Sequence, residues 1–440
     1  MNPISQSMHR TVTWLWSADP FSDPSRELKL RELFLDTLGC AIAGFAKAEV
    51  AQTAASLART DGGPVSLPGT TSPLSAGGAA YAFALAACWD EACEGLARAH
   101  GRPGLHAIPP ALALGIANRE TLREVLTGAV RGYEMAARLG ERMRIQPGMH
   151  VDGTWGTFGA TAAAASMLRL SQSETIASLE ATACQLPYSL YLPVAEGANV
   201  RNIYVAEAAA RGIRTAQSIG AGITAPEGAL DDVDTRALGG LGAGATWAGE
   251  GEWLLEQGYL KPFAAVRHVH YGAAAALEWR TGQSNADAFR DINTLRLDVY
   301  PEAITYCGNR DPKTAIQAQF SLSYGIAAAL ALGDLGPAAY EPENLHREDI
   351  RRLESLVALS PLDVEGNERK AILHIEAGGQ AQVITSENVP GDAANPLTGE
   401  PLAAKFRRYT APVIGAVRAD AMLEAVMRAP LETPVTDIVA

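Results

Sequence analysis

The chain has 440 residues, a formal net charge of −13 and only 6% aromatic residues. That length is too great for one simple core and indicates two domains, or one large domain with an insertion. The acidic balance argues against a nucleic-acid partner, because a phosphate backbone would repel the chain. Local clusters of basic residues are informative, since they run against this background.

The cysteines and the N-terminus indicate a reducing compartment and no membrane insertion. The cysteines are odd in number and none has CxxC spacing, as is typical of reduced thiols. The first residues, MNPISQSMHRTVTWLW, lack the apolar stretch and cleavage site of a signal peptide. Apolar runs such as GAAYAFALAACW are too short to span a membrane. We therefore expect a cytoplasmic protein without a membrane partner. The cysteines are Cys40, Cys88, Cys93, Cys184 and Cys307.

The first 260 residues predict helices and hardly any strand. In residues 25–46, apolar side chains recur every four positions, and Asp23 and Pro24 mark the start of a helix. Ser171 with Glu174 forms a capping box before another helix. The predicted helices cover residues 25–46, 76–93, 108–118, 120–140, 157–169, 173–184 and 205–221.

The pattern changes after Lys261. Residues 292–300 alternate like a half-buried strand, and residues 371–385 predict a hairpin around Gly378-Gly379. Residues 320–334 predict a buried helix, and residues 397–427 return to helix with Phe406, Val413 and Val417 on one side. We therefore predict a mainly α protein. Residues 1–262 and 395–440 form a large all-helical domain, and residues 263–394 form a smaller inserted α+β domain.

The motifs of metal and nucleotide sites are missing from the sequence. HEXXH, paired CxxC and Walker A patterns do not occur, and His100 and His106 have no nearby Cys or Asp ligand to complete a metal site. The glycine-rich run at residues 239–244 has no preceding strand and is better explained as a connection. GTWGTFGA at 153–160 leads into an Ala-rich helix, where glycines favour close helix packing. The residues alone therefore do not support a metal site or a phosphate-binding loop.

Titratable and basic residues near Pro/Gly turns are the remaining candidates for a functional site. Each alone is more often a solvated or structural group, but loops that carry several of them commonly bear function. They are Asp90, His100, Arg102, His106, His150, Arg201, Lys261, Arg267, His268, Tyr306 and Arg310.

Several sequence motifs that contain or flank these residues occur in an order that resembles the MmgE/PrpD family. That family includes 2-methylcitrate dehydratase, cis-aconitate decarboxylase and iminodisuccinate epimerase. Each motif alone has low specificity, but together the motifs span nearly the whole chain in the family's order. They are LDTLGCAIAG, RPGLHAIPPALALG, HVDGTWGTFGATAAAASMLRL, NVRNIYVAEAAARGIRTAQ, GYLKPFAAVRHVH, NRDPKTAIQAQFSLSYGIAAALALGD and LAAKFRRY.

The resemblance implies a homodimer with its site in a cleft between the helical and α+β domains, without a cofactor. It also implies proton abstraction next to a carboxylate of a small di- or tricarboxylic acid. Loss of hydroxide then gives a dehydratase, loss of CO2 a decarboxylase, and reprotonation on the opposite face an epimerase. Each reaction needs cations for the carboxylates and an acid/base group.

The resemblance also suggests roles for individual residues. His150 matches the family histidine before its GT-G-FGA segment and is the predicted general acid/base. Lys261 matches the lysine of a KPY-like segment and would clamp a carboxylate or donate a proton. Arg267 and His268 match the RH that follows, and Tyr306 aligns more loosely with a pocket tyrosine. Asp90, with Glu91, resembles the acidic pair ahead of the His-Pro motif.

Two departures from the family pattern bear on the substrate. Arg102 stands where the family usually has the histidine of His-Pro, and Arg201 and Tyr204 replace a lysine and a histidine. An arginine cannot act as a base at neutral pH, but it can grip a carboxylate with two hydrogen bonds. Either His100 or His106 takes over proton transfer in this loop, with His100 preferred, or this chain needs one titrating group fewer.

Three functions remain open from the sequence. The first is a lyase acting on a small polycarboxylate other than methylcitrate, by dehydration or decarboxylation. The second is an epimerase on the same fold. The third is a non-catalytic protein that binds an anion through Arg102 and Arg201.

Overall fold

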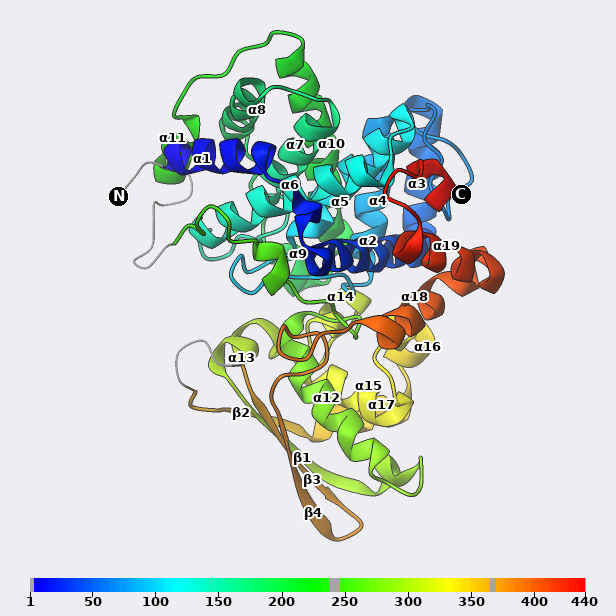
Figure 1. Cartoon of the computed structure of the whole chain (residues 1–440). Helices are drawn as coiled ribbons and strands as arrows, with labels where there is room; N and C mark the ends of the chain where they lie inside the picture. The colour runs from blue at the N-terminus through cyan, green and yellow to red at the C-terminus, as the bar shows by residue number, and fades with distance from the viewer. Residues whose placement is uncertain (1–3, 144, 237–245, 365–368, 440) are drawn as a thin grey trace.

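The computed structural model describes residues 4–143, 145–236, 246–364 and 369–439 (Figure 1). The glycine-rich run at 239–244 lies outside the described residues. Helices dominate up to residue 236 and again at the C-terminal end. They are α1 Ile4–Ser17, α2 Pro24–Phe45, α3 Ala48–Thr60, α4 Ala76–Trp89, α5 Pro103–Asn118, α6 Leu122–Arg142, α7 Gly156–Met167, α8 Gln172–Cys184, α9 Leu192–Glu196, α10 Ile203–Gly220, α11 Ala229–Arg236, α18 Gly399–Ile414, α19 Ala416–Arg428 and α20 Val435–Val439.

Helix α7 is the centre of the helical part and is buried along nearly its whole length. It packs against α5, α6, α8 and α10. Glycines allow this close approach: a Cβ on Gly132 of α6 would lie 2.6 Å from the Gly159 carbonyl oxygen. The small residues of GTFGATAAAASM therefore serve helix packing here, as the sequence predicted.

The middle of the chain folds into a separate sheet with its own helices, drawn at the bottom of Figure 1. The strand order is β2-β1-β3-β4, with β1 parallel to β2 and antiparallel to β3. Helices α12, α15 and α17 pack with these strands. The elements are α12 Arg267–Thr281, β1 Ile292–Val299, α13 Pro301–Cys307, α14 Ala315–Gln319, α15 Leu322–Leu332, α16 Pro342–Leu345, α17 Glu348–Leu356, β2 Val357–Pro361, β3 Ala371–Ala377 and β4 Gln380–Ser386.

The predicted fold class, mainly helical with a smaller α+β part, is confirmed. Leu295, Leu297 and Val299 form the buried side of β1, and β3 and β4 form the predicted hairpin. The Ser171–Glu174 capping box and the Asp23 cap also occur as expected. The division of the chain after residues 262 and 394 stays a prediction.

Two details differ from the sequence prediction. Helix α5 begins at Pro103 rather than near residue 108. Proline fits the first helical position because the backbone N–H that it lacks would have no intrahelical hydrogen-bond partner there. The predicted helix over 397–427 breaks at Gly415, whose φ of 84° lies in the left-handed region. Val417 consequently lies on α19 and is 87% exposed.

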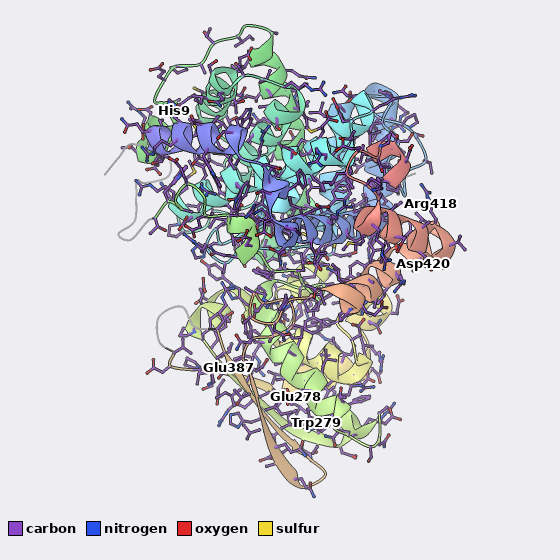
Figure 2. All side chains as sticks on the ribbon, in the orientation of Figure 1. His9, Glu278, Trp279, Glu387, Arg418 and Asp420 are labelled. Carbon is purple, nitrogen blue, oxygen red and sulfur yellow. The ribbon has the colours of Figure 1, made fainter. Side chains whose placement is uncertain are left out.

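The C-terminal helices return to the N-terminal part of the chain. Lys405 of α18 bonds to Asp36 of α2, and the Phe406 ring packs on Gly39. Arg418 and Asp420 project from α19 at the edge of the molecule (Figure 2). Within the described residues, no helix combines the length and apolar character needed to cross a bilayer.

Candidate active site

A cavity of about 380 Å³ collects most of the predicted site residues. Its walls come from the loops before α5 and α7, the start of α10, the segment before α12, helix α13 and Arg369. Five cationic side chains and three carboxylates line it, in a chain whose net charge is negative. The predicted residues in its lining are His100, Arg102, His150, Arg201, Lys261, Arg267, His268 and Tyr306.

Two buried carboxylates hold two arginines in a closed ion network. Glu91 Oε2 accepts hydrogen bonds from Arg102 Nη1 at 3.0 Å and from Arg201 Nη1 at 2.7 Å. Asp152 Oδ2 accepts from Arg102 Nη2 and, at 3.0 Å, from Arg201 Nη2. Each arginine thus spans the same two carboxylates, and charge-assisted bonds of this kind set geometry strongly.

Lys261 adds a third cation to this network. Its Nζ donates to Glu91 Oε1 at 2.8 Å and to the Glu91 carbonyl oxygen at 3.0 Å. A pair of backbone bonds between Gly95 and Tyr259 ties the Lys261 segment to the loop that carries Glu91. An ammonium has three donors, so Lys261 keeps one N–H for a ligand.

The network keeps its carboxylates ionised despite burial. Burial alone would raise the pKa of Glu91, but Arg102, Lys261 and Arg201 outweigh it and hold this pKa well below its usual value. Burial would likewise raise the pKa of Asp152, but the neighbouring Arg102, His150 and Arg201 outweigh it, and this pKa is lowered. Three cations facing two carboxylates leave this network with a net positive charge.

The ion network bears on the expected role of Arg102 and Arg201 as residues that bind a carboxylate. Both terminal nitrogens of each guanidinium bond to protein carboxylates, and each of these bonds uses one of the two N–H groups on its nitrogen. Asp152 Oδ1 and Arg201 Nε are buried and have no hydrogen-bond partner among the described residues. These two atoms, the third Lys261 donor and the second N–H of each terminal nitrogen of Arg201 are polar groups that the network leaves open.

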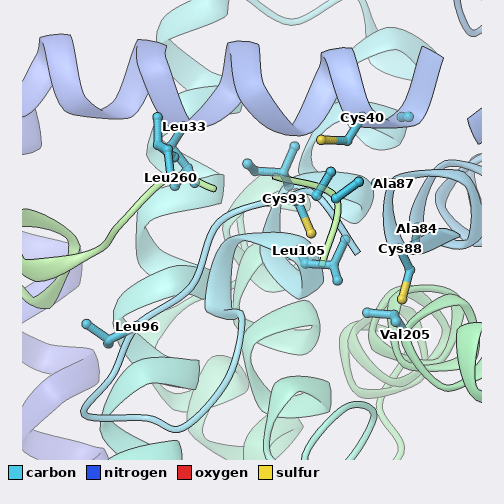
Figure 3. Packing of buried hydrophobic residues seen from close by; sticks show 14 of the residues in the cluster. Leu33, Cys40, Ala84, Ala87, Cys88, Cys93, Leu96, Leu105, Val205 and Leu260 are labelled. Carbon is cyan, nitrogen blue, oxygen red and sulfur yellow. The ribbon is translucent and has the colours of Figure 1, made fainter. Parts of the chain in front are cut away.

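Two buried thiols lie against the Arg102 guanidinium. Arg102 Nη2 lies 3.3 Å from Cys88 Sγ, and Nη1 lies 3.6 Å from Cys93 Sγ. Figure 3 shows both cysteines among buried residues such as Leu105. Burial raises the pKa of Cys93 to about 12, which keeps the thiol neutral. All five cysteines are free.

His150 is held as a neutral ring. The backbone N–H of Asp152 donates to its Nδ1 at 3.0 Å, so the neutral ring carries its proton on Nε2. Burial is the main cause that lowers the His150 pKa to about 4, and Arg201 and Arg102 add to it against the opposing Asp152 charge. A neutral Nε2–H is a hydrogen-bond donor, and this geometry favours that role over the predicted general acid/base.

A row of aromatic rings joins His150 to His268. Tyr191 stacks on His150 at 6.0 Å and meets the Tyr306 ring at 5.7 Å, and Tyr306 stacks on His268 at 6.0 Å. Nδ1 of His268 lies 2.7 Å from the Tyr300 hydroxyl oxygen. Burial, followed by the charges of Arg369 and Lys261, lowers the His268 pKa to about 3.

Two non-glycine residues with positive φ shape the site loop. Glu91 and His100 both have φ of 52°, a conformation that costs energy and that occurs often at functional sites. The backbone turn at Glu91 sends its carboxylate into the cavity while the preceding side chain points elsewhere. His100 lines the cavity near His268.

Two predicted site residues lie outside the cavity. Asp90 faces away from it and pairs with Lys47 at 3.3 Å, because the turn reverses the direction of successive side chains. His106 lies inside α5, where Nδ1–H donates to the Arg102 carbonyl at 2.9 Å and Nε2 accepts from Gly153 N–H at 3.1 Å. Both ring nitrogens are occupied, so His106 joins the two loops and does not face a ligand.

Arg267 lines the cavity but is already paired. Its guanidinium bonds to Asp392 and lies over the rings of Tyr259 at 4.8 Å and Tyr271 at 5.6 Å. Arg310 is exposed and donates to the Ser355 carbonyl, away from these residues. In the described ranges, no group of three or more His, Cys, Asp or Glu side chains could hold a metal ion.

Comparison with protein-family models identifies the chain. Residues 20–238 match the MmgE/PrpD N-terminal domain, and residues 263–429 match the MmgE/PrpD C-terminal domain. The chain belongs to the MmgE/PrpD family. The resemblance seen in its motifs is thereby confirmed, and the family includes lyases and related enzymes. A search of curated proteins gives no match.

Sequence reasoning missed several residues of this family member's cavity, among them Asp152, Tyr191 and Arg369. Asp152 follows His150 by two positions within the motif HVDGTWG, and that proximity was the available signal. Tyr191 and Arg369 stand in stretches without any motif, and only the fold brings them to the cavity.

Proposed function

We propose that the chain is a cofactor-independent lyase that removes a proton next to a carboxylate of a small di- or tricarboxylic acid. The observation that carries this proposal is the excess of cations in a cavity that also holds neutral histidines. The cations attract carboxylates and stabilise the charge that develops when the C–H bond breaks. A cavity of about 380 Å³ suits a small acid.

His268 is the base in this proposal. When its Nδ1–H donates to the Tyr300 hydroxyl, the lone pair of Nε2 is open to accept the substrate proton. The bound substrate brings negative charge next to Arg369 and Lys261, whose charges help to lower the His268 pKa in the empty site. Binding therefore raises the proton affinity of the base at the moment when it is needed.

In this proposal Lys261 donates a proton and His150 donates a hydrogen bond. In a dehydration, His268 takes the proton from carbon, the C–O bond breaks, and Lys261 gives a proton to the leaving hydroxide, which departs as water. His150 donates from Nε2–H to the carboxylate oxygen on which negative charge grows. In a decarboxylation, the C–C bond breaks, CO2 leaves, and Lys261 gives a proton to the carbanion that remains.

An epimerase is the second candidate, and the aromatic row favours it. His150 and His268 lie at opposite ends of that row and both line the cavity, so each could serve as one of the two acid/base groups that an epimerase needs. We also propose that the protein is a homodimer, on the basis of the motif resemblance. We propose a cytoplasmic location on the basis of its composition.

A panel assay with product detection tests the proposal. The acids are citrate, methylcitrate, cis-aconitate and iminodisuccinate, with water loss, CO2 release and change of configuration followed separately. We expect one acid to react, and Lys261→Met to lower the rate at least 100-fold. The control Lys313→Met, at an exposed lysine, should keep the wild-type rate. Equal rates in both variants would remove Lys261 from the mechanism.

A further inference from the structure

Arg369 is a cavity residue that neither the motifs nor the ion network accounts for. It lies just before β3 in the α+β part and is only partly exposed. It lines the cavity that holds Lys261 and His268, and also the neighbouring hollow around Glu302 and Asn388. The side chain therefore faces the site from the part of the fold opposite to Arg102 and Arg201.

The other cations of the cavity each have a carboxylate. Arg102, Arg201 and Lys261 bond to Glu91, and Arg267 bonds to Asp392. Arg369 forms no hydrogen bond or ion pair with any described residue. A partly buried guanidinium without a counter-charge is costly unless a ligand supplies one.

The surroundings of Arg369 keep its guanidinium charged. Burial would lower its pKa, but Tyr300, Tyr259, Tyr271 and the Glu302 carboxylate raise it above the usual value. Glu302 is exposed at the rim and does not reach ion-pair distance. The charge of Arg369 is the second cause of the lowered His268 pKa, which places it near the proposed base.

We propose that Arg369 binds a second carboxylate of the substrate, so that the ligand carries at least two carboxylates. This inference rests on the proposed function. One carboxylate lies at the open donors of Lys261 and Arg201, and the other lies at Arg369, with the reacting carbon between them near His268. A planar guanidinium with paired N–H groups matches a carboxylate in two parallel bonds.

Calorimetric titration of the full chain tests this assignment with succinate, citrate, succinamate and inorganic phosphate. Succinamate is succinate with one carboxylate replaced by an amide. For Arg369→Gln we expect succinate and citrate to bind roughly 10- to 100-fold more weakly, the loss of one charge-assisted contact. Succinamate affinity should hardly change, and Arg369→Lys should fall between. The control is Arg214→Gln, at an exposed arginine of α10.

The outcomes separate this inference from the proposed function. Unchanged succinate and citrate affinity in Arg369→Gln, with wild-type binding intact, would overturn the role of Arg369 alone. Tighter binding of phosphate than of either acid, lost in Arg369→Gln, would overturn the carboxylate assignment. Absence of binding of both acids to the wild type would count against the proposed function itself. Matching circular dichroism and urea midpoints confirm that the variants are folded.

Discussion

Glu91 gathers three cations that come from three distant stretches of the chain. Arg102, Arg201 and Lys261 all donate to its carboxylate, and Asp152 shares two of them. Buried ion pairs are costly to form and still more costly to break, because the partner left behind keeps an uncompensated charge. Glu91 is therefore a structural centre of the site as well as part of its electrostatics.

Replacing Glu91 should destabilise the fold strongly. In Glu91→Gln three buried cations share the single Asp152 carboxylate, and we expect a loss of ~3–5 kcal/mol in the free energy of unfolding. Urea denaturation measures it. Asp232→Asn, which breaks the exposed pair with Arg236, is the matched control and should cost less than ~1 kcal/mol. Similar losses in both variants would contradict a buried network.

His150 should be replaceable by another donor. Loss of one preorganised donor costs about 100- to 1000-fold in kcat, and we expect this for His150→Ala. His150→Gln keeps an N–H and should recover part of the loss, whereas a general acid/base role would leave Gln as poor as Ala. Steady-state kinetics on the reacting acid measures both. His346→Ala, at an exposed histidine, is the control.

The lowered His150 pKa also predicts how stability depends on pH. The folded ring titrates at about 4, against about 6.5 in the unfolded chain, so the unfolded state binds more protons in between. This contribution is complete above pH 6.5 and is lost as the pH falls towards 4. From pH 7.5 to 5 the wild type should lose about 2 kcal/mol more stability than His150→Gln. Equal losses would show that the ring is not held neutral.

At the residue scale, the sequence predicted most of the cationic and histidine side chains but not their pairing. His150, Lys261 and His268 stand in motifs, so their place in the cavity could be anticipated. Arg102 and Arg201 were expected to bind a carboxylate of the substrate. Only the three-dimensional structure reveals that their guanidinium groups also bond to the Glu91 and Asp152 carboxylates. Asp90 and Glu91 are adjacent, and a local φ value decides which of them enters the cavity.

At the scale of elements, loop ends and helix starts position the site. Arg102 precedes α5, Arg201 precedes α10 and Lys261 precedes α12. The regular elements followed from apolar periodicity and capping residues. The boundaries at Pro103 and Gly415 did not, because proline fits a first helical turn and glycine breaks a helix without changing the apolar pattern.

Close packing of α6 on α7 supports these loops and can be tested with a single methyl group. Gly132→Ala places a Cβ 2.6 Å from the Gly159 carbonyl oxygen and 2.8 Å from Ala163 Cβ, so we expect a loss of ~1–3 kcal/mol in stability. The control Gly77→Ala meets only the Ser75 Oγ at 3.8 Å and should be neutral or slightly stabilising. Urea unfolding distinguishes them, and a neutral Gly132→Ala would contradict the tight contact.

At the scale of the whole molecule, the cavity combines residues from both parts of the fold. The helical part supplies Glu91, Arg102, His150 and Arg201, and the α+β part supplies His268 and Arg369. The family order of motifs allowed the architecture to be predicted from sequence. Arg369 could not be, since nothing in its local sequence distinguishes it from a surface arginine.

Deuterium exchange tests the central claim, proton abstraction next to a carboxylate, most directly. The wild-type chain is incubated in D2O with citrate, methylcitrate, cis-aconitate and iminodisuccinate, and the C–H signals are followed by NMR. We predict loss of the signal beside a carboxylate in at least one acid, abolished in a folded His268→Asn variant and retained in His346→Asn. Absence of exchange in every acid with folded wild-type protein would contradict the account.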